Sequence, residues 1–400
     1  MQQMALYGLL PANRGVKVKI AMKTTHTLIH ACLRVVLVLV LPAAVQAQFT
    51  FTTNNGAITI TGFSGGGAVV VPAQTNGHPV TAIGTNAFQN NSSLTSLTLP
   101  DSVTNLGDSA FYFCSGLTNV TLGTNVSYIG DSAFYQCSGL ASFTLPARVT
   151  SVGGTVFAWC SGLTNVALTT NVTSIGGSAF HDCTALLNLV IPDSVTNIGQ
   201  GAFDECVSLT NVTIGCHVPA IGGYDFSACY SLVHVTIPDS VTNVGTYAFY
   251  GGSSLAGVTI GSHVANLGDY AFLYCGNLTC AFFTGNAPAV GSLVLDGDSH
   301  LTNYYLPGTT GWSNTFAGRP AVLWNPQMQT HDGCFGLRTN RFGFNLTGNT
   351  NLIIVVEACT NLFHPVWQPV QTNALTGGSC YFGDPTWTNY PGRYYRIRSP

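Results

Sequence analysis

A 23-residue repeat runs through about half of this 400-residue chain and constrains its fold more than any other feature. Leucine and glycine recur at this step, as at Leu117, Leu140 and Gly130. Phenylalanine marks every copy without an insertion, at Phe88, Phe111, Phe134, Phe157, Phe180, Phe203, Phe226, Phe249 and Phe272. Repetition at this period predicts stacked units, because one unit of this size cannot bury its own apolar side.

One copy, LTNVTLGTNVSYIGDSAFYQCSG, shows what kind of unit repeats. Its apolar residues are spaced too irregularly for one helix or one flat strand, and they fit a coil that turns several times. Stacked coils place identical residues above one another at the strand spacing of about 4.8 Å. We therefore assign structural roles in continuous buried columns to Phe111, Phe134, Phe157, Cys137, Cys160, Leu117, Leu140 and Gly130.

The parts of each copy have different local preferences. The stretch LTNVTL alternates enough to form a short strand, and Gly-Thr-Asn or Pro-Asp-Ser then turns the chain. The recurring glycine is expected to adopt a positive φ or to lie at a tight approach between coils. Asp108, Asp131 and Asp269 follow it, where each is expected to cap a single helical or 3₁₀ turn.

The full pattern, L-x-x-V-x-L/I-P-x-x-V-x-x-I-G-x-x-A-F-x-x-C, resembles the BspA-type leucine-rich repeat, also called the Treponema pallidum type. The resemblance covers residues 80 to 282, and the period, the I-P-D-S-V-T-N-I-G segment and A-F-x-x-C all match. It implies a curved solenoid with parallel strands on the concave face. It also implies secretion or surface display, and binding of proteins or surfaces rather than catalysis.

Together these patterns predict a mainly β chain: a leucine-rich-repeat solenoid of about nine 23-residue coils with short helical or 3₁₀ turns, plus a small C-terminal β domain. The expected N-terminal cap is 48–81, with a hairpin around Asn54-Asn55-Gly56. The solenoid is 82–281, its C-terminal cap is 282–325, and the β module is 326–400. That module resembles those that end many secreted bacterial proteins.

Residues 1–47 have the features of a secretory signal peptide. VVLVLVL follows Arg34 and precedes PAAVQA, and Met22 followed by Lys23 is a more natural start than Met1. The apolar run is too short to cross a bilayer, and no later segment suggests an integral membrane segment in the mature chain. We therefore expect an exported bacterial protein that is secreted or held at the cell surface.

Composition narrows the possible partners. The chain is 46% hydrophobic but only 7% charged, with a net charge of -3. It has no basic stripe to displace counterions from phosphates, so we expect no nucleic-acid partner. Gly, Thr, Asn and Ser supply the polarity instead, which favours turns and β-structure.

The cysteines are expected to be structural. Seven occupy one column of the repeat, at Cys114, Cys137, Cys160, Cys183, Cys206, Cys229 and Cys275, where Asn91 and Gly252 stand in the other two copies. Parallel side chains in a ladder have poor disulfide geometry, so buried thiols are favoured over bridges. Among Cys334, Cys359 and Cys380 of the tail, one pair is a candidate bridge. No C-x-x-C motif occurs, so zinc is not indicated.

The chain lacks a constellation for catalysis or cofactor binding. It contains no H-E-x-x-H, P-loop or dinucleotide fingerprint. Asp101, Asp193 and Asp239 repeat within turns, which indicates turn chemistry rather than a glycosidase pair. We expect no metal, no cofactor and no enzymatic activity, with a carbohydrate-active hydrolase as a weaker alternative.

The outward strand residues are the candidate binding surface. They form a neutral ladder of amides and hydroxyls suited to hydrogen bonding with protein or glycan. The ladder comprises Asn119, Thr121, Ser142, Thr144, Asn165, Asn188, Asn211, Thr213, His234, Thr236 and Thr259. The same residues are also good solvent-facing strand residues, which leaves open a passive structural spacer or envelope component. The expected function is secreted or surface binding and adhesion to an extracellular protein or glycan.

Overall fold

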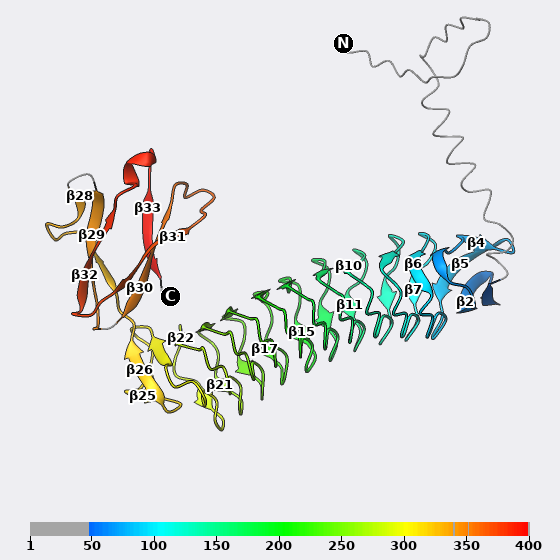
Figure 1. The fold of residues 1–400 in the computed structure, drawn as a ribbon, viewed down its shortest axis with the longest axis horizontal. Helices are drawn as coiled ribbons and strands as arrows, with labels where there is room; N and C mark the ends of the chain where they lie inside the picture. The colour runs from blue at the N-terminus through cyan, green and yellow to red at the C-terminus, as the bar shows by residue number, and fades with distance from the viewer. Residues whose placement is uncertain (1–47, 339–340, 351, 399–400) are drawn as a thin grey trace, which may run out of the picture. The chain divides into compact units, whose positions relative to one another are not determined.

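A computed structural model describes residues 48–338, 341–350 and 352–398 of the chain. The predicted signal peptide, 1–47, lies outside these residues. The described chain forms coils that follow one another in sequence order (Figure 1). It is mainly β, and a single 3₁₀ helix, η1 (Trp387–Asn389), is its only described helix. No helix among the described residues is long and apolar enough to cross a membrane.

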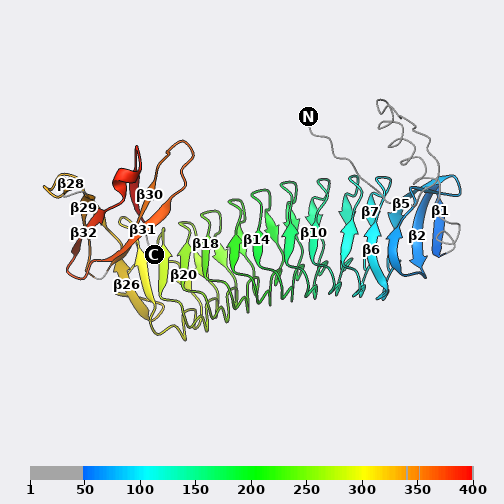
Figure 2. The same ribbon diagram turned by 45° about the horizontal axis from the view of Figure 1, so that its top comes forward.

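One strand of each coil joins a parallel ladder, with neighbours in register one coil apart (Figure 2). These ladder strands are β3 (Gly67–Val70), β6 (Leu94–Thr98), β8 (Asn119–Thr121), β10 (Ser142–Thr144), β12 (Asn165–Ala167), β14 (Asn188–Val190), β16 (Asn211–Thr213), β18 (His234–Ile237), β20 (Gly257–Ile260), β22 (Cys280–Phe283), β24 (Thr302–Tyr305) and β26 (Arg319–Leu323). They form three sheets in series, β3-β6-β8, β10-β12, and β14 through β26. The solenoid predicted from the repeat is confirmed.

A second parallel ladder follows the turn after each ladder strand. Its strands are β5 (His78–Ile83), β7 (Asn105–Leu106), β9 (Tyr128–Ile129), β11 (Ser151–Val152), β13 (Ser174–Ile175), β15 (Asn197–Ile198), β17 (Ala220–Ile221), β19 (Asn243–Val244), β21 (Asn266–Leu267) and β23 (Ala289–Val290). Most residues in these strands pair with the residue 23 positions further along the chain, as Asn243 does with Asn266. Two ladders per coil explain why one repeat has neither a helical nor a single-strand period.

The N-terminal end carries the predicted hairpin. Strands β1 (Phe49–Asn54) and β2 (Ala57–Phe63) pair antiparallel, and β2 continues parallel onto β5. Asn55 has φ 50° and Gly56 has φ 76°, as a two-residue hairpin turn requires. A further hairpin strand, β4 (Gln74–Thr75), pairs with β5.

The number of coils is larger than expected: about 11 turns rather than nine. The ladder continues through the segment 282–325, where β22 pairs with β24 at a step of 22 residues and β24 with β26 at a step of 18. Strand β25 (Thr315–Phe316) then pairs antiparallel with β26 and ends the sheet. Coils of unequal length still stack, because only the paired strand must keep its register while the turns absorb deletions.

The phenylalanine column forms the centre of the solenoid core. Phe111 and Phe134 stack with ring centroids 5.1 Å apart, and the stacking continues at 5.1–5.7 Å through Phe272. Every ring of this column, from Phe88 to Phe272 at 23-residue steps, is fully buried. Each coil therefore buries its ring between two others, and removing one would leave a cavity shared by two neighbours.

The expected helical or 3₁₀ turns are absent from the described coils. Instead, alternate backbone amides close tight turns, as Ala110 donates to Gly107 and Tyr112 donates to Ser109. The intervening amides donate to the next coil, as Phe111 does to Ala133 at 2.8 Å. A helix would use every amide within one coil, so the bonds between coils replace it. Asp131 likewise accepts from the amide of Gly154 in the next coil rather than capping its own turn.

The recurring glycine is explained by close approach and not by positive φ. A β-carbon added at Gly176 would lie 2.5 Å from the amide nitrogen of Gly154, one coil away. Residues with a positive φ lie instead two positions after this glycine, for example Ser132 (φ 56°) and Tyr247 (φ 59°). The close approach between coils therefore occurs at the recurring glycine, and the positive φ occurs at a different position of the repeat.

The cysteine column consists of buried free thiols, as predicted. All seven members are buried, and every cysteine among the described residues is free, including Cys334, Cys359 and Cys380. The candidate bridge in the tail is therefore not formed. The thiols donate to the carbonyl oxygen of the phenylalanine 26 residues earlier, as Cys137 does to Phe111 at 3.2 Å.

Two antiparallel sheets form the C-terminal module. One contains β27 (Gln327–Gln329), β28 (Gly336–Arg338), β29 (Arg341–Thr347) and β32 (Ser379–Asp384). The other contains β30 (Ile353–Cys359), β31 (Gln368–Ala374) and β33 (Tyr394–Arg398). Phe344 and Phe382 are fully buried at its centre, and Phe282, Tyr304 and Trp324 of the last coils pack against this core.

Candidate binding face

The outward residues of the ladder strands form two rows, which we call the ladder face. Within a strand, Asn119 and Thr121 are exposed while Val120 lies between them on the core side. Parallel pairing aligns equivalent residues, so Asn188 lies beside Asn211, and Asn211 lies beside His234. The first row is Asn119, Ser142, Asn165, Asn188, Asn211, His234, Gly257 and Cys280, and the second is Thr121, Thr144, Ala167, Val190, Thr213, Thr236, Thr259 and Phe282.

The structure places all eleven predicted residues on this face. Ten are exposed, while Thr259 is half-buried. The amide of Asn211 donates to the side-chain oxygen of Asn188 at 3.1 Å, so the first row is partly linked by its own hydrogen bonds. Ala167 and Val190 interrupt the hydroxyls of the second row, and Val190 is 61% exposed. The face is therefore neutral and mostly polar, with one apolar step near its middle.

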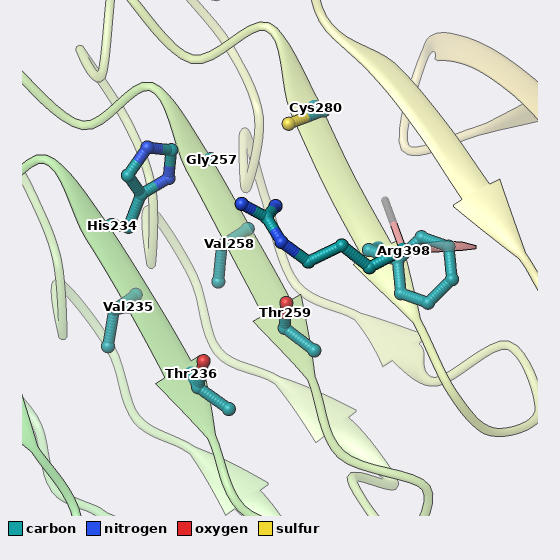
Figure 3. A pocket seen from close by; sticks show the side chains of 9 residues that line it. His234, Val235, Thr236, Gly257, Val258, Thr259, Cys280 and Arg398 are labelled. Atoms are coloured by element: carbon teal, nitrogen blue, oxygen red, sulfur yellow. The ribbon is translucent and has the colours of Figure 1, made fainter. Parts of the chain in front are cut away.

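A pocket of about 360 Å³ lies where the ladder face reaches the C-terminal module (Figure 3). Strands β18, β20 and β22 form its floor, and Arg398 of β33 reaches over them. The lining residues are His234, Val235, Thr236, Gly257, Val258, Thr259, Cys280, Phe282 and Arg398. Its volume lies within the range of small-ligand sites, roughly 300–1,000 Å³.

Gly257 makes the hollow in the floor. It stands in the first row, between His234 of β18 and Cys280 of β22. A β-carbon at Gly257 would lie 3.0 Å from Nδ1 of His234 and 3.0 Å from Sγ of Cys280. The two side chains therefore lean towards the space that the missing side chain leaves.

The charge at the pocket comes from the C-terminal module. Nε of Arg398 donates to Glu357 at 2.6 Å, and Arg396 bonds the other oxygen of the same carboxylate at 2.7 Å. Burial would raise the pKa of Glu357, but the hydrogen bonds and charges of Arg398 and Arg396 outweigh it and hold the pKa below its usual value. Glu357 therefore balances at least part of the charge that Arg398 brings to the pocket.

The thiol in the pocket is not poised for nucleophilic chemistry. Burial raises the pKa of Cys280, so the neutral thiol dominates at physiological pH. Among residues 48–398 that the structure describes, no three His, Cys, Asp or Glu side chains gather as a metal site would require. The face and pocket can therefore offer hydrogen bonds and an apolar ring to a ligand.

Besides the two valines of the pocket floor, Val235 and Val258, sequence reasoning missed Gly257, Cys280, Phe282 and Arg398. Of the last four, the first three follow from the 23-residue register, because they continue the rows of His234 and Thr236. Arg398 lies more than 100 residues beyond the strands it covers, and nothing in the repeat places it there.

These features define a leucine-rich-repeat scaffold protein with a solvent-facing parallel ladder. The family model for the BspA type leucine rich repeat region matches residues 81–210 and 196–317, with six copies. The chain belongs to this family, and the resemblance inferred from its repeat is confirmed.

Solved structures of bacterial leucine-rich-repeat proteins are similar to this chain. A protein from Bacteroides ovatus ATCC 8483 is 21% identical over 69% of this chain and 75% of its own, with a TM-score of 0.49. A leucine rich cell surface protein from Faecalibacterium prausnitzii A2-165 is 26% identical over 66% and 94%, with a TM-score of 0.39. The T. pallidum leucine-rich-repeat protein is 28% identical over 65% and 89%, with a TM-score of 0.26. No curated protein matches the chain.

Proposed function

We propose that this chain is an exported, non-enzymatic binding protein that holds an extracellular protein or glycan on its ladder face. The observation that carries the proposal is the pair of exposed rows, in which amides and hydroxyls recur in register from Asn119 to Thr236. A largely repeating neutral surface suits a repeating ligand, because every rung from Asn119 to Thr236 offers at least one polar side chain to it.

Several features support export and binding over catalysis. The segment 1–47 is proposed as a signal peptide, and residues 48–81 as a cap with 326–400 as an accessory module. The ladder face carries no carboxylate pair, which a glycoside hydrolase would need. The thiol beside it has a raised pKa, so it is a poor nucleophile.

Binding can be tested with the chain from residue 48 to 400 on immobilised extracellular polysaccharides and matrix proteins. The solenoid should not be cut from the module at 325, because Tyr304 and Phe282 pack against the module core. The test variant carries Asn119→Asp, Asn165→Asp and Asn211→Asp, which places three like charges on the ladder face. Capture by the unmodified chain and its loss in this variant are the expected results.

A matched control carries the same change on the other ladder, as Asn105→Asp, Asn243→Asp and Asn266→Asp. These asparagines are also exposed, and each is the first residue of a short strand. Equal loss in both variants would mean that charge alone prevents capture. Unchanged capture by the test variant, or saturable capture by nothing, would favour a passive spacer over a binding protein.

A further inference from the structure

We infer that three stacked tyrosines, Tyr224, Tyr247 and Tyr270, are a site of oxidative cross-linking, at which two neighbouring rings join as dityrosine. They occupy the same position of three consecutive coils, on the tight turns that follow β17, β19 and β21 (Figure 1). The ring centroids of Tyr224 and Tyr247 are 5.0 Å apart, and those of Tyr247 and Tyr270 are 4.8 Å apart, with planes inclined by 24° and 16°. A cross-linking site goes beyond the proposed function and uses from it only the export of the chain, which would expose these rings to extracellular oxidants.

The three tyrosines stand where the backbone favours small residues. All have a positive φ, of 63°, 59° and 60°, which is costly for a bulky side chain. In the six preceding coils the same position carries Asn86, Ser109, Ser132, Thr155, Ser178 and Gly201. Those coils stack without an aromatic ring at this position, so packing of the solenoid does not require one. Backbone strain that packing does not require points to a functional role.

Hydrogen bonds between coils hold the stack in register. The amide of Tyr224 donates to the carbonyl of Thr246 at 3.1 Å, and the amide of Tyr247 donates to the carbonyl of Asp269 at 3.0 Å. Thr246 directly precedes Tyr247, and Asp269 directly precedes Tyr270, so these bonds fix neighbouring tyrosines side by side. Reactants held in this way have a high effective concentration, which favours coupling within one chain over coupling between chains.

The rings are accessible to a soluble oxidant. Tyr224 is 39% exposed, and Tyr247 and Tyr270 are half-buried. The repeat region 82–281 contains no methionine to consume oxidant, and the seven thiols of the cysteine column are buried. The stacked phenols therefore have few competitors in the solenoid.

Coupling is a two-electron oxidation shared by two rings. A haem peroxidase supplied with hydrogen peroxide removes one electron and one proton from each phenol, which gives two phenoxyl radicals. The radicals join through ring carbons ortho to their oxygens, and each of these carbons then releases its hydrogen as a proton while each oxygen regains one. The peroxide accepts the two electrons and two protons, its O–O bond breaks, and it leaves as two water molecules. One C–C bond is formed, both phenols are restored, and the chain has lost two hydrogens.

The test oxidises the chain from residue 48 to 400 at low protein concentration, with a haem peroxidase and limiting hydrogen peroxide. Every protein in the test carries Cys216→Ala, because the exposed thiol of Cys216 would reduce phenoxyl radicals. Dityrosine fluorescence measures the yield, size-exclusion chromatography isolates the monomer, and protease digestion with mass spectrometry maps the joined peptides. The expected product is a monomer that has lost two hydrogens, in which Tyr247 is joined to Tyr224 or to Tyr270.

Two serine variants separate stacking from closeness. Tyr247→Ser removes the middle ring and introduces the residue that three earlier coils carry at this position, so the fold should be kept. Tyr224 and Tyr270 are then two coils, or about 10 Å, apart, and cross-links from either should fall at least about tenfold. Tyr250→Ser is the matched control, because Tyr250 meets Tyr247 edge-on at 5.4 Å and 82°, and Ser227 holds its position in the preceding coil. This change leaves the stack in place, so the yield should change by less than about twofold.

A second stack tests the same rule within the molecule. Tyr112 and Tyr135 lie one coil apart and stack at 4.7 Å and 11°, and no further pair of tyrosines is stacked in the part of the chain that the structure describes. They should also join, in peptides that differ from those of Tyr247. This second cross-link should survive Tyr247→Ser.

Other outcomes overturn the inference. It is contradicted by cross-links that form mainly between chains, by equal yields at the more exposed Tyr230 and Tyr274, or by oxidation without joined peptides. A yield at the stack that survives Tyr247→Ser, equal losses in both serine variants, or the same pattern in the urea-unfolded chain would also contradict it. The oxidation needs no ligand, and the tyrosines lie outside the ladder face, so the result is separate from the capture test of the proposed function.

Discussion

The thiol of Cys160 donates a hydrogen bond to the carbonyl oxygen of Phe134, in the preceding coil, at 3.1 Å. Cys114, Cys137, Cys183, Cys206, Cys229 and Cys275 make the same contact at 3.0–3.5 Å. Asn91, in the same column, donates from Nδ2 to Gly65, also 26 residues earlier. Eight of the nine members of the column therefore donate a side-chain hydrogen bond, which matters because a buried carbonyl without a partner is costly, while Gly252 has no side chain to donate.

Replacing Cys160 by alanine should destabilise the solenoid by about 1–2 kcal/mol, because the carbonyl of Phe134 loses its donor and a small cavity forms. Cys160→Ser should cost less, since a hydroxyl can donate in place of the thiol. Urea denaturation followed by circular dichroism measures both. Cys216→Ala is the control, because Cys216 is exposed. Equal destabilisation by all three changes would contradict the role of the hydrogen bond.

The column thiols should resist alkylation in the folded protein. Burial raises the pKa of Cys160 and of Cys114 to about 12, so almost no thiolate exists at pH 8. Iodoacetamide at pH 8 followed by peptide mass spectrometry should label Cys216 and leave the column unmodified. In denaturant all should react. Labelling of Cys160 under native conditions at the rate of Cys216 would refute the burial of the column.

Gly176→Ala should destabilise the protein by about 1–3 kcal/mol, because the new methyl group would force two coils apart. The neighbouring Gly177→Ala is a matched control. A β-carbon at Gly177 would meet nothing closer than 3.4 Å, so this change should stay within about 0.5 kcal/mol. Thermal denaturation of the two variants compares them directly, and similar midpoints would contradict the close approach at Gly176.

Acid should weaken the stacking of coils through the turn aspartates. Backbone amides of the next coil donate to three turn carboxylates: Thr124 to Asp101 at 2.7 Å, Cys216 to Asp193 at 2.8 Å, and Ser262 to Asp239 at 2.6 Å. These hydrogen bonds lower the pKa of all three aspartates. A lowered folded pKa stabilises the fold above the unfolded value of about 3.9 and loses this effect as pH falls further. Denaturation midpoints between pH 6 and pH 2.5 should fall more for the native chain than for a variant with all three changed to Asn. Parallel curves would exclude these carboxylates as the cause.

Asp298 should give the fold the opposite pH dependence to the turn aspartates, with stability that falls as pH rises. It is fully buried, neither carboxylate oxygen has a hydrogen-bond partner among the described residues, and burial raises its pKa to about 7. Its folded pKa exceeds the unfolded value of about 3.9, so stability should fall as pH rises from about 4 to 7. Asp298→Asn should therefore add about 1–3 kcal/mol at pH 8 and little at pH 4. A variant that is less stable than the native chain at pH 8 would contradict this.

The repeat alone predicted the solenoid and much of its interior. Phe134, Leu140 and Cys137 identify buried columns because identical residues 23 positions apart must meet when coils stack. The outward direction of Asn119 and Thr121 follows from strand alternation. Turn geometry was less predictable, because the amide of Phe111 can donate within its own coil or to the next one.

By itself, the sequence determined the family, the register of the ladder and the identity of the two rows, since all three depend on spacing along one chain. Only the tertiary structure decided how many coils stack, because β24 and β26 continue the ladder without keeping the period. It also decided that Arg398 lies over Gly257. The two residues belong to different sheets and lie more than 100 positions apart in the chain, and no local pattern records which surfaces come together.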